Sequence, residues 1–377
     1  MRNRTEDTPS PKKGFAMPRR IYLTLALVAC LLGGCSRPSA NVKYRIAVIP
    51  KGLTHEFWQS IHRGAERAAA DLSAEGISTA IDWDGPQKES DAREQINLVN
   101  LKIGSGINGL VLAPQDSKRM VDCVKQAVDG GVPVVIIDSG LDPAELKKRP
   151  HLIVKYVATN NYNGGRLAAQ RLLEVLAKDG KSAPRLILFR YAVGSESTEQ
   201  REQGFLDYVN EQIDKQKKAG KPTITLLSTD QYAGATVDDA KKSAGPLLIK
   251  YKDELDGLFV VNESSATGML IALRSQGFNG KVRYVTFDSS EPLLQAIREG
   301  DVDGTVVQDP YRMGYLGVWT LVKHLEGYDV SADGKDLGTG EYVVTKDNLD
   351  TEATRELFDP SLQARRTIKK PEWKKVK

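Results

Sequence analysis

The chain has 377 residues, which is long for a single hydrophobic core and suits two domains. Its composition, 40% hydrophobic and 27% charged, is ordinary for a globular protein. The formal net charge of +4 does not indicate a nucleic-acid partner, because residues 1–34 carry six basic and two acidic residues and leave equal numbers of each beyond that point.

The first 35 residues have the form of a targeting segment. A basic start is followed by an apolar run at 21–32, which is short for a membrane span and typical of a signal peptide. The run ends in Leu32-Gly33-Gly34-Cys35, which resembles a bacterial lipobox and implies cleavage before Cys35 and lipidation of its sulfur. An alternative match ends at Cys30 but leaves a very short apolar run, and Met17 is an alternative start. Residues 36–43 are expected to form a polar tether.

From residue 44 onward, short apolar runs alternate with segments of helical period. In the first half we expect strands at 44–50, 77–86, 109–114 and 132–140, helices at 54–72, 94–106 and around 120–128, and a strand followed by a long helix within 155–180. In the second half we expect strands at 185–191, 223–230, 257–261, 282–289 and 304–310, and helices at 198–212, 237–250, around 269–273 and at 311–327. The basic, proline-interrupted residues 363–377 are interpreted as a solvated surface tail.

Two of the apolar runs end alike, "VPVVIIDSG" at 132–140 and "VRYVTFDSS" at 282–290. Each follows a turn closing on glycine, an apolar strand and a helix of period 3.6. Strand, helix and strand within about thirty residues form a βαβ unit, and continuous apolar strands indicate a parallel sheet covered on both faces. The sequence therefore predicts an α/β protein with two such sheets, in a duplicated architecture. The lone cysteine beyond the leader, Cys123, is expected to be a core residue.

Ligands of open α/β sheets bind at the carboxyl ends of the strands, where this chain places polar and aromatic side chains. The candidate ligand-binding residues are His55, Phe57, Trp58, Asp138, Ser139, Arg201, Tyr232, Asn262, Glu263, Asp288 and Gln308. The four histidines lack zinc spacing, and no phosphate-binding or nucleophile motif occurs, so no metal, cofactor or catalytic residue is predicted. Carboxylates, amides and guanidinium groups hold pairs of hydroxyls, and aromatic rings cover the C–H face of a sugar, so a polyhydroxylated ligand fits this set.

Eight segments in order carry a resemblance to a known family: "IAVIPKGLTHEFWQSIHRGA", "GLVLAPQD", "VPVVIIDSG", "NNYNGGRLAA", "STEQREQGF", "FVVNE", "VTFDSS" and "GTVVQDP". Together they resemble sugar-binding periplasmic proteins of the ribose-binding type, which serve carbohydrate ABC importers. The resemblance implies two Rossmann-like, doubly wound lobes joined by a three-crossing hinge and closing over a monosaccharide. The N-terminal lobe is expected at 44–159 plus about 309–338, the C-terminal lobe at 160–308 plus about 339–350, and a C-terminal extension at 351–377.

Carried over position by position, the resemblance assigns roles to the candidate residues. Phe57 and Trp58 become ring-stacking groups with Tyr232 as a third, and His55 stands where relatives often carry an amide. The hydroxyl binders become Asp138, Arg201, Asn262, Asp288 and Gln308. Ser139 replaces an arginine and Ala113 an asparagine that are common in ribose binders, so the expected ligand is a small neutral sugar or polyol other than ribose.

Structural explanations stand beside these roles. Asp138 and Asp288 also fit turn-capping residues, Arg201 a charge on a helix surface, and Glu263 the N-cap of the following helix. Phe57 shares the helical stripe of Ile61, which favours Trp58 as the stacking ring. Lys51 and Asp116 are expected to be solvated loop residues or turn residues and not ligand contacts.

The sequence thus predicts an extracytoplasmic, lipid-anchored and monomeric solute-binding protein that delivers its ligand to a membrane ABC permease. The alternatives are a ligand-sensing module of a membrane receptor, or a glycoside-acting enzyme using Asp138 and Asp288 as paired carboxylates. A sugar-responsive transcription regulator uses similar lobes but needs an N-terminal helix-turn-helix, and the leader occupies that position.

Overall fold

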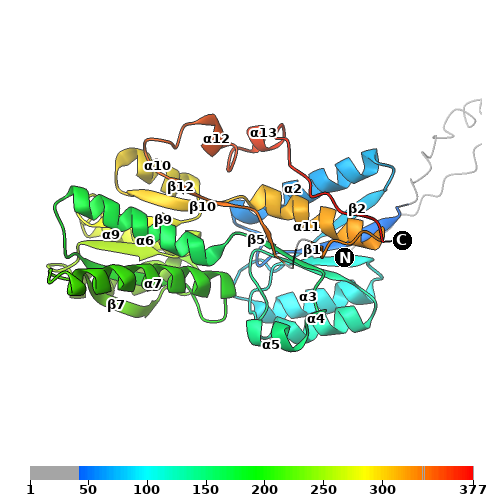
Figure 1. The fold of residues 1–377 in the computed structure, drawn as a ribbon, viewed down its shortest axis with the longest axis horizontal. Helices are drawn as coiled ribbons and strands as arrows, with labels where there is room; N and C mark the ends of the chain where they lie inside the picture. Colours follow the sequence, from blue (N-terminus) through cyan, green and yellow to red (C-terminus); the bar gives the residue numbers. More distant parts are fainter. Residues whose placement is uncertain (1–41, 333, 335, 377) are drawn as a thin grey trace, which may run out of the picture. The chain divides into compact units, whose positions relative to one another are not determined.

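The computed structural model describes residues 42–332, 334 and 336–376. The predicted signal peptide, the lipidation site Cys35 and most of the tether lie outside these residues. The described chain forms two six-stranded sheets, each covered by helices on both faces (Figure 1). The predicted fold class, a pair of doubly wound α/β lobes, is confirmed.

The first sheet forms the N-terminal lobe, and all its strands are parallel. Its order is β11-β5-β4-β3-β1-β2, which is the order of a doubly wound fold with one added edge strand. The strands are β1 (Tyr44–Ile49), β2 (Thr79–Trp83), β3 (Gly109–Leu112), β4 (Val134–Ile137), β5 (Lys155–Ala158) and β11 (Asp336–Gly338).

The second sheet repeats this order as β12-β10-β9-β8-β6-β7. It differs at its edge, where β12 runs antiparallel to β10. Its strands are β6 (Arg185–Arg190), β7 (Thr225–Tyr232), β8 (Gly257–Val260), β9 (Arg283–Phe287), β10 (Gly304–Gln308) and β12 (Glu341–Val344). The edge strands β11 and β12 are absent from the sequence prediction because neither is a continuous buried apolar run like the predicted strands.

Alternating side chains of each strand supply two cores, one on each face of the sheet. In β1, Ile46 and Val48 pack under α2 (Glu56–Ala74) and α11 (Pro310–Leu325), whereas Ala47 and Ile49 pack under α3 (Ala92–Gly104) and α4 (Met120–Asp129). The second sheet is covered by α6 (Asn161–Lys178) and α7 (Glu196–Lys218) on one face. Its other face carries α8 (Val237–Lys250), α9 (Glu263–Ser275) and α10 (Glu291–Glu299). A short α5 (Pro143–Lys148) follows β4.

Three connections between elements of the sheets pass from one lobe to the other, and the C-terminal segment makes a fourth passage after β12. The first crossing joins β5 to α6, the second joins β10 to α11, and the third joins β11 to β12. Helix pairs beside these crossings pack closely through glycine. A Cβ built on Gly165 of α6 would lie 2.0 Å from the backbone oxygen of Arg201 in α7, so only glycine permits this approach, which places Arg201 beside the first crossing.

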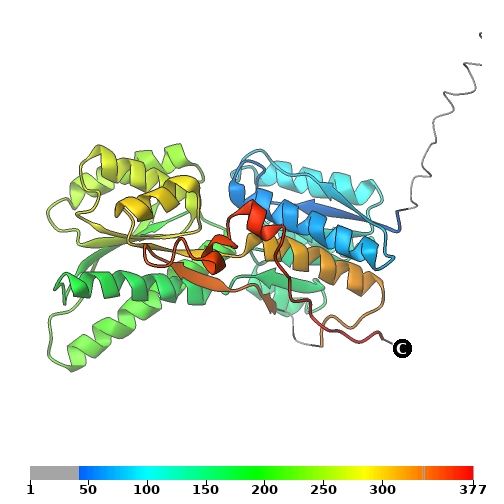
Figure 2. The same ribbon diagram turned by 90° about the horizontal axis from the view of Figure 1, so that it is seen from above.

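The C-terminal segment corrects the sequence interpretation, because it is not a solvated tail. After β12 the chain forms α12 (Glu352–Arg355), and Leu357 then joins the core of the C-terminal lobe. From there α13 (Pro360–Gln363) leads back along the N-terminal lobe (Figure 2). Ile368 and Trp373 pack on the core that α2 and α11 cover. The basic side chains lie along aromatic rings, as where the Nζ of Lys370 sits 4.1 Å from the centre of the Trp319 ring.

Candidate functional site

The carboxyl ends of the central strands of both sheets face one cavity. Nine of the eleven predicted ligand-binding residues line it: His55, Phe57, Trp58, Asp138, Arg201, Asn262, Glu263, Asp288 and Gln308. Six further residues complete the lining: Lys51, Glu89, Tyr191, Ser195, Ser197 and Thr198. The convergence follows from the duplicated topology, since each lobe presents the same edge of its sheet.

Asp138 and Asp288 occupy equivalent positions just beyond β4 and β9. Among the described residues they are the only non-glycine residues with positive φ, at 63° and 68°. Aspartate tolerates this left-handed conformation better than most side chains. The repeated Asp-Ser therefore reflects a backbone requirement as well as a carboxylate aimed at the cavity, and the turn explanation accounts for part of the pattern.

Asp138 is paired with a buried cation. Its Oδ2 lies 2.9 Å from the Nζ of Lys51, and the two side chains are 5% and 7% exposed. Lys51 Nζ also donates to the hydroxyls of Ser195 and Ser197 in the opposite lobe, at 3.4 and 3.3 Å. The interpretation of Lys51 as a solvated loop residue is therefore wrong.

Asp288 is held by three donors and is buried. Gln308 Nε2 donates to its Oδ1 at 2.5 Å, while the backbone N–H of Glu263 and Nη1 of Arg201 donate to its Oδ2 at 3.3 and 3.4 Å. Burial raises the pKa of Asp288, and the charge of Arg201 and the Gln308 hydrogen bond oppose this shift.

Arg201 is 3% exposed, so it is not a charge on a helix surface. Its Nε donates to Oδ1 of Asn161 at 2.8 Å, and its guanidinium lies 3.7 Å from the centre of the Phe287 ring. These contacts fix the plane of the guanidinium at the edge of the cavity.

His55 and Glu89 form a second ionic centre. His55 Nδ1 lies 3.0 Å from Oε1 of Glu89, and Glu89 also accepts from Trp58 Nε1 at 2.7 Å and Tyr191 OH at 2.9 Å. Burial lowers the pKa of His55, but the hydrogen bond and charge of Glu89, with Glu263 and Asp288, outweigh it and raise the pKa to about 9. Burial raises the pKa of Glu89, but His55, Lys51 and Trp58 outweigh it and lower the pKa to about 2. His55 is therefore a cation and a donor at neutral pH.

Asn262 and Glu263 lie at the start of α9. Asn262, not Glu263, occupies the N-cap position, so the N-cap role considered for Glu263 is wrong. Glu263 Oε1 accepts from Thr267 at 3.1 Å, and its Oε2 lies 3.7 Å from His55 Nδ1. Oδ1 of Asn262 is buried and has no hydrogen-bond partner, which leaves one acceptor at the cavity.

The two rings at the start of α2 have different surroundings. Trp58 is 2% exposed and belongs to the core of the N-terminal lobe, and Phe57 stands edge-on to it with ring centres 4.9 Å apart. The preference for Trp58 because Phe57 shares the stripe of Ile61 is thus not supported, since Phe57 is the less buried ring.

Tyr232 and Ser139 do not line the cavity. Tyr232 is 38% exposed at the end of the edge strand β7, where its ring lies against Arg190. The third aromatic group of the cavity is instead Tyr191, at the end of the central strand β6. Ser139 is fully buried, and its hydroxyl accepts from the backbone N–H of Ser197 at 3.1 Å. It therefore joins the two lobes.

The cavity is narrow in this arrangement. Its free volume is about 40 Å³, which admits a few waters, whereas pockets for small ligands span about 300–1,000 Å³. Three cations and four carboxylates face it: Lys51, His55, Arg201, Glu89, Asp138, Glu263 and Asp288. The nearly balanced charges and the many fixed donors and acceptors suit a neutral molecule with several hydroxyls, for which the side chains and lobes must move apart.

Two doubly wound lobes with facing strand ends and three crossings define a two-lobed α/β ligand-binding protein. Residues 46–329 match the family described as periplasmic binding protein domain, and the chain belongs to that family. This finding confirms the resemblance that the sequence motifs predict. No helix among the described residues is both long and apolar enough to cross a membrane.

Individual relatives are sugar-binding proteins. The chain is 30% identical over 315 residues to the D-ribose/D-allose-binding protein of Pseudomonas aeruginosa, covering 82% of this chain and 92% of the relative. It is similar to a carbohydrate transporter solute-binding protein of Agrobacterium radiobacter in complex with D-arabinose, with 28% identity, a TM-score of 0.72 and coverage of 85% and 100%. A solute-binding protein of Agrobacterium vitis with bound D-fucose gives 30% identity, a TM-score of 0.71 and coverage of 83% and 99%.

Proposed function

We propose that the protein binds a neutral sugar between its lobes and delivers it to an ABC importer without altering it chemically. The main observation in support is the cavity at the facing strand ends, where charged groups of both signs and three aromatic rings converge. The ligands named for the relatives, D-ribose or D-allose, D-arabinose and D-fucose, are neutral sugars. Ser139 and Ala113 differ from the arginine and asparagine that are common in ribose binders, so the proposed ligand is a sugar other than ribose.

Binding is proposed to couple to closure of the lobes. A ligand that contacts Asp138 and Asp288 at once stabilises only the closed arrangement, because these carboxylates belong to different lobes. The narrow cavity supports this proposal, since a sugar enters only after the lobes separate. An importer that recognises the closed form would then distinguish loaded from empty protein.

The same geometry argues against a glycosidase. A glycosidase needs one carboxyl group that gives up a proton. Asp138 is paired with Lys51, and the groups around Asp288 all donate to it, so both act as hydrogen-bond acceptors. Incubation with chromogenic glycosides tests this inference, and turnover that disappears in Asp288→Asn would contradict it.

A thermal-shift screen of neutral sugars, polyols and nucleosides, followed by calorimetry, tests the proposed function. We expect at least one neutral sugar to bind with a Kd below about 10 μM, and Asp138→Ala to weaken it at least tenfold. A screen without a neutral-sugar hit would contradict the proposal. Loss of sugar uptake on deletion of the gene would separate delivery to an importer from sensing.

We also propose that Cys35 anchors the mature chain to a membrane and that the protein acts as a monomer in the periplasm or at the cell surface. The lipobox-like sequence supports the anchor. Radiolabelled palmitate should enter the wild-type protein but not Cys35→Ser, whereas Cys30→Ser should still be labelled.

A further inference from the structure

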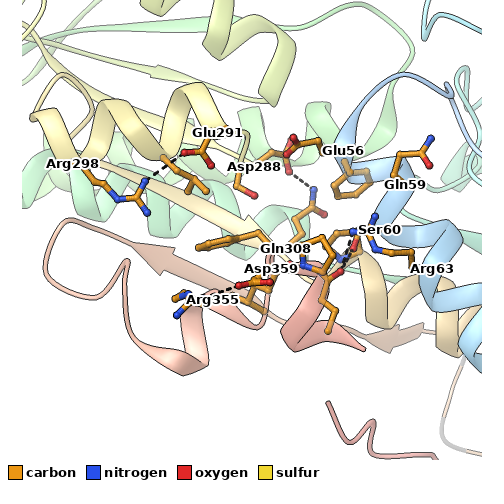
Figure 3. Close-up of a pocket in the computed structure, with 18 residues that line it drawn as sticks. Glu56, Gln59, Ser60, Arg63, Asp288, Glu291, Arg298, Gln308, Arg355 and Asp359 are labelled. Atoms are coloured by element: carbon orange, nitrogen blue, oxygen red, sulfur yellow. Dashed lines mark hydrogen bonds and ion pairs between the residues drawn. The ribbon is translucent and has the colours of Figure 1, made fainter. Parts of the chain in front are cut away.

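A larger cavity adjoins the narrow cavity at the strand ends, which we call the inner cavity. Its volume is about 550 Å³, within the range of small-ligand pockets. Phe57, Asp288 and Gln308 line both spaces, so the two are neighbours that share these three side chains as walls. Figure 3 shows the larger cavity, which we call the outer cavity, between α2, the start of α10 and the C-terminal segment.

The C-terminal segment forms one wall of the outer cavity. Arg355, Phe358, Asp359 and Gln363 line it, and all four lie beyond residues 46–329, the stretch that matches the family. Gln363 is fully buried and accepts from Ser60 at 3.2 Å and from Arg63 at 3.0 Å. Hydrogen bonds therefore hold this wall of the outer cavity against α2.

The outer cavity combines two kinds of group that suit a sugar ring. Phe57 and Phe358 supply aromatic surface. Arg63 lines the cavity, makes no ion pair within the described residues, and donates through its Nη2 to Gln363. An unpaired guanidinium donor of this kind suits ligand hydroxyls.

The charges of the outer cavity favour a neutral occupant. Arg355 pairs with Asp359 at 2.8 Å, and Arg298 lies 3.7 Å from Glu291. With Glu56 and Asp288 also in the lining, carboxylates offset the arginines and no net positive field attracts an anion.

From these observations we propose that the outer cavity is a second subsite that accepts a second, neutral sugar unit. The ligand is then a disaccharide or a glycoside, with one ring in the inner cavity and the attached unit between Phe57, Phe358 and Arg63. This inference rests on the proposed sugar-binding function and extends it by naming the size of the ligand. Residues 46–329 supply the first subsite and part of the second, and the C-terminal segment completes the second.

Calorimetry on the full-length chain, in a detergent without a sugar headgroup, tests the proposal. The probes are D-ribose, D-allose, D-arabinose, D-fucose, D-galactose and D-glucose, their phenyl glycosides, and the disaccharides lactose, melibiose, maltose and sucrose. We expect at least one two-unit probe to bind at least tenfold tighter than its own monosaccharide. Phe358→Ala and Arg63→Gln should each remove most of that gain and change monosaccharide affinity less than twofold.

Phe278→Ala is the matched control, because Phe278 packs on the same core as Phe358 but does not line the outer cavity. It should leave both affinities unchanged. Monosaccharide binding without a gain for any two-unit probe would overturn the second subsite while the proposed function stands. If no probe of either kind binds, both the proposed function and the subsite are overturned.

Discussion

Asp138 and Asp288 each combine a backbone role with a side-chain role. Both have positive φ, and both present a carboxylate to the inner cavity. Glycine adopts this conformation without steric cost, whereas alanine is strained there by roughly 1 kcal/mol or more. The two roles can therefore be separated by substitutions that remove the same carboxylate.

We expect Asp288→Gly to be more stable than Asp288→Ala by about 1 kcal/mol, although both lose the contacts with Arg201 and Gln308. Urea denaturation measures the difference in the free energy of unfolding. Asp84 is the control, since it lies outside the left-handed region, and there the glycine variant should be no more stable than the alanine variant. Equal stabilities at position 288 would show that the positive φ carries no cost.

The His55–Glu89 pair predicts a dependence of stability on pH. The folded-state pKa of His55 is about 9, above its ordinary 6.5, so its stabilising contribution is fully present below pH 6.5 and is lost as the pH rises through 9. The shift corresponds to at most about 3 kcal/mol. His55→Gln should thus lose less stability than wild type between pH 6.5 and 9, as measured by urea denaturation at both pH values.

The low pKa of Glu89 acts in the opposite direction. Its contribution is present above pH 4.5 and is lost as the pH falls towards 2. Glu89→Gln should therefore reduce the pH dependence of stability that comes from Glu89 and also the part that comes from His55. The exposed His151 provides the control, and His151→Gln should retain the wild-type slope between pH 6.5 and 9.

Residues at strand ends could be predicted because the carboxyl edge of a parallel sheet is a fixed place. Which strand is central could not be read from the sequence. Tyr191 follows the interior strand β6 and lines the cavity, whereas the predicted Tyr232 is the last residue of the edge strand β7. Glu89 and Lys51 were missed as site residues because a loop sequence does not show that its charged side chains turn inward to distant partners.

At the scale of elements, helices with a regular apolar stripe were predicted because their pattern is local. The C-terminal segment was misinterpreted because its few apolar residues are separated by basic ones, and the surface that receives them comes from α2 and α11. Its anchoring also uses a buried ion pair. Arg366 Nη2 lies 2.6 Å from Oδ2 of Asp309, which is fully buried at the N-cap of α11.

We expect Arg366→Ala to destabilise the protein by about 2–4 kcal/mol, because it leaves the buried carboxylate of Asp309 without its cation. The exposed neighbour Arg365 is the matched control, and Arg365→Ala should change the free energy of unfolding by less than about 0.5 kcal/mol. Chemical denaturation measures both. If the two variants were equally stable, the ion pair would not anchor the segment.

At the scale of the whole binding unit, residues 194–197 of the C-terminal lobe make several of the hydrogen bonds that join the lobes. The backbone oxygen of Gly194 accepts from Ser117 N at 2.9 Å, and Oε2 of Glu196 accepts from Gly140 N at 2.9 Å. Ser197 N donates to Ser139, as described above. These hydrogen bonds exist only while the lobes are together, so they stabilise the closed form without touching a ligand.

Ser139→Ala should therefore shift the balance towards the open form and weaken sugar binding. One lost hydrogen bond of about 0.5–1.5 kcal/mol corresponds to a two- to tenfold rise in apparent Kd. Calorimetry with the best sugar from the screen measures the affinity, and small-angle X-ray scattering of the ligand-free protein should show a larger radius of gyration than wild type. Ser289 is the control, because it follows the equivalent aspartate of the other lobe and lines the outer cavity rather than joining the lobes. Since closure and contact with the ligand are distinct contributions, a weaker Kd in Ser139→Ala without an increase in the radius of gyration would contradict the role of this hydrogen bond in closure.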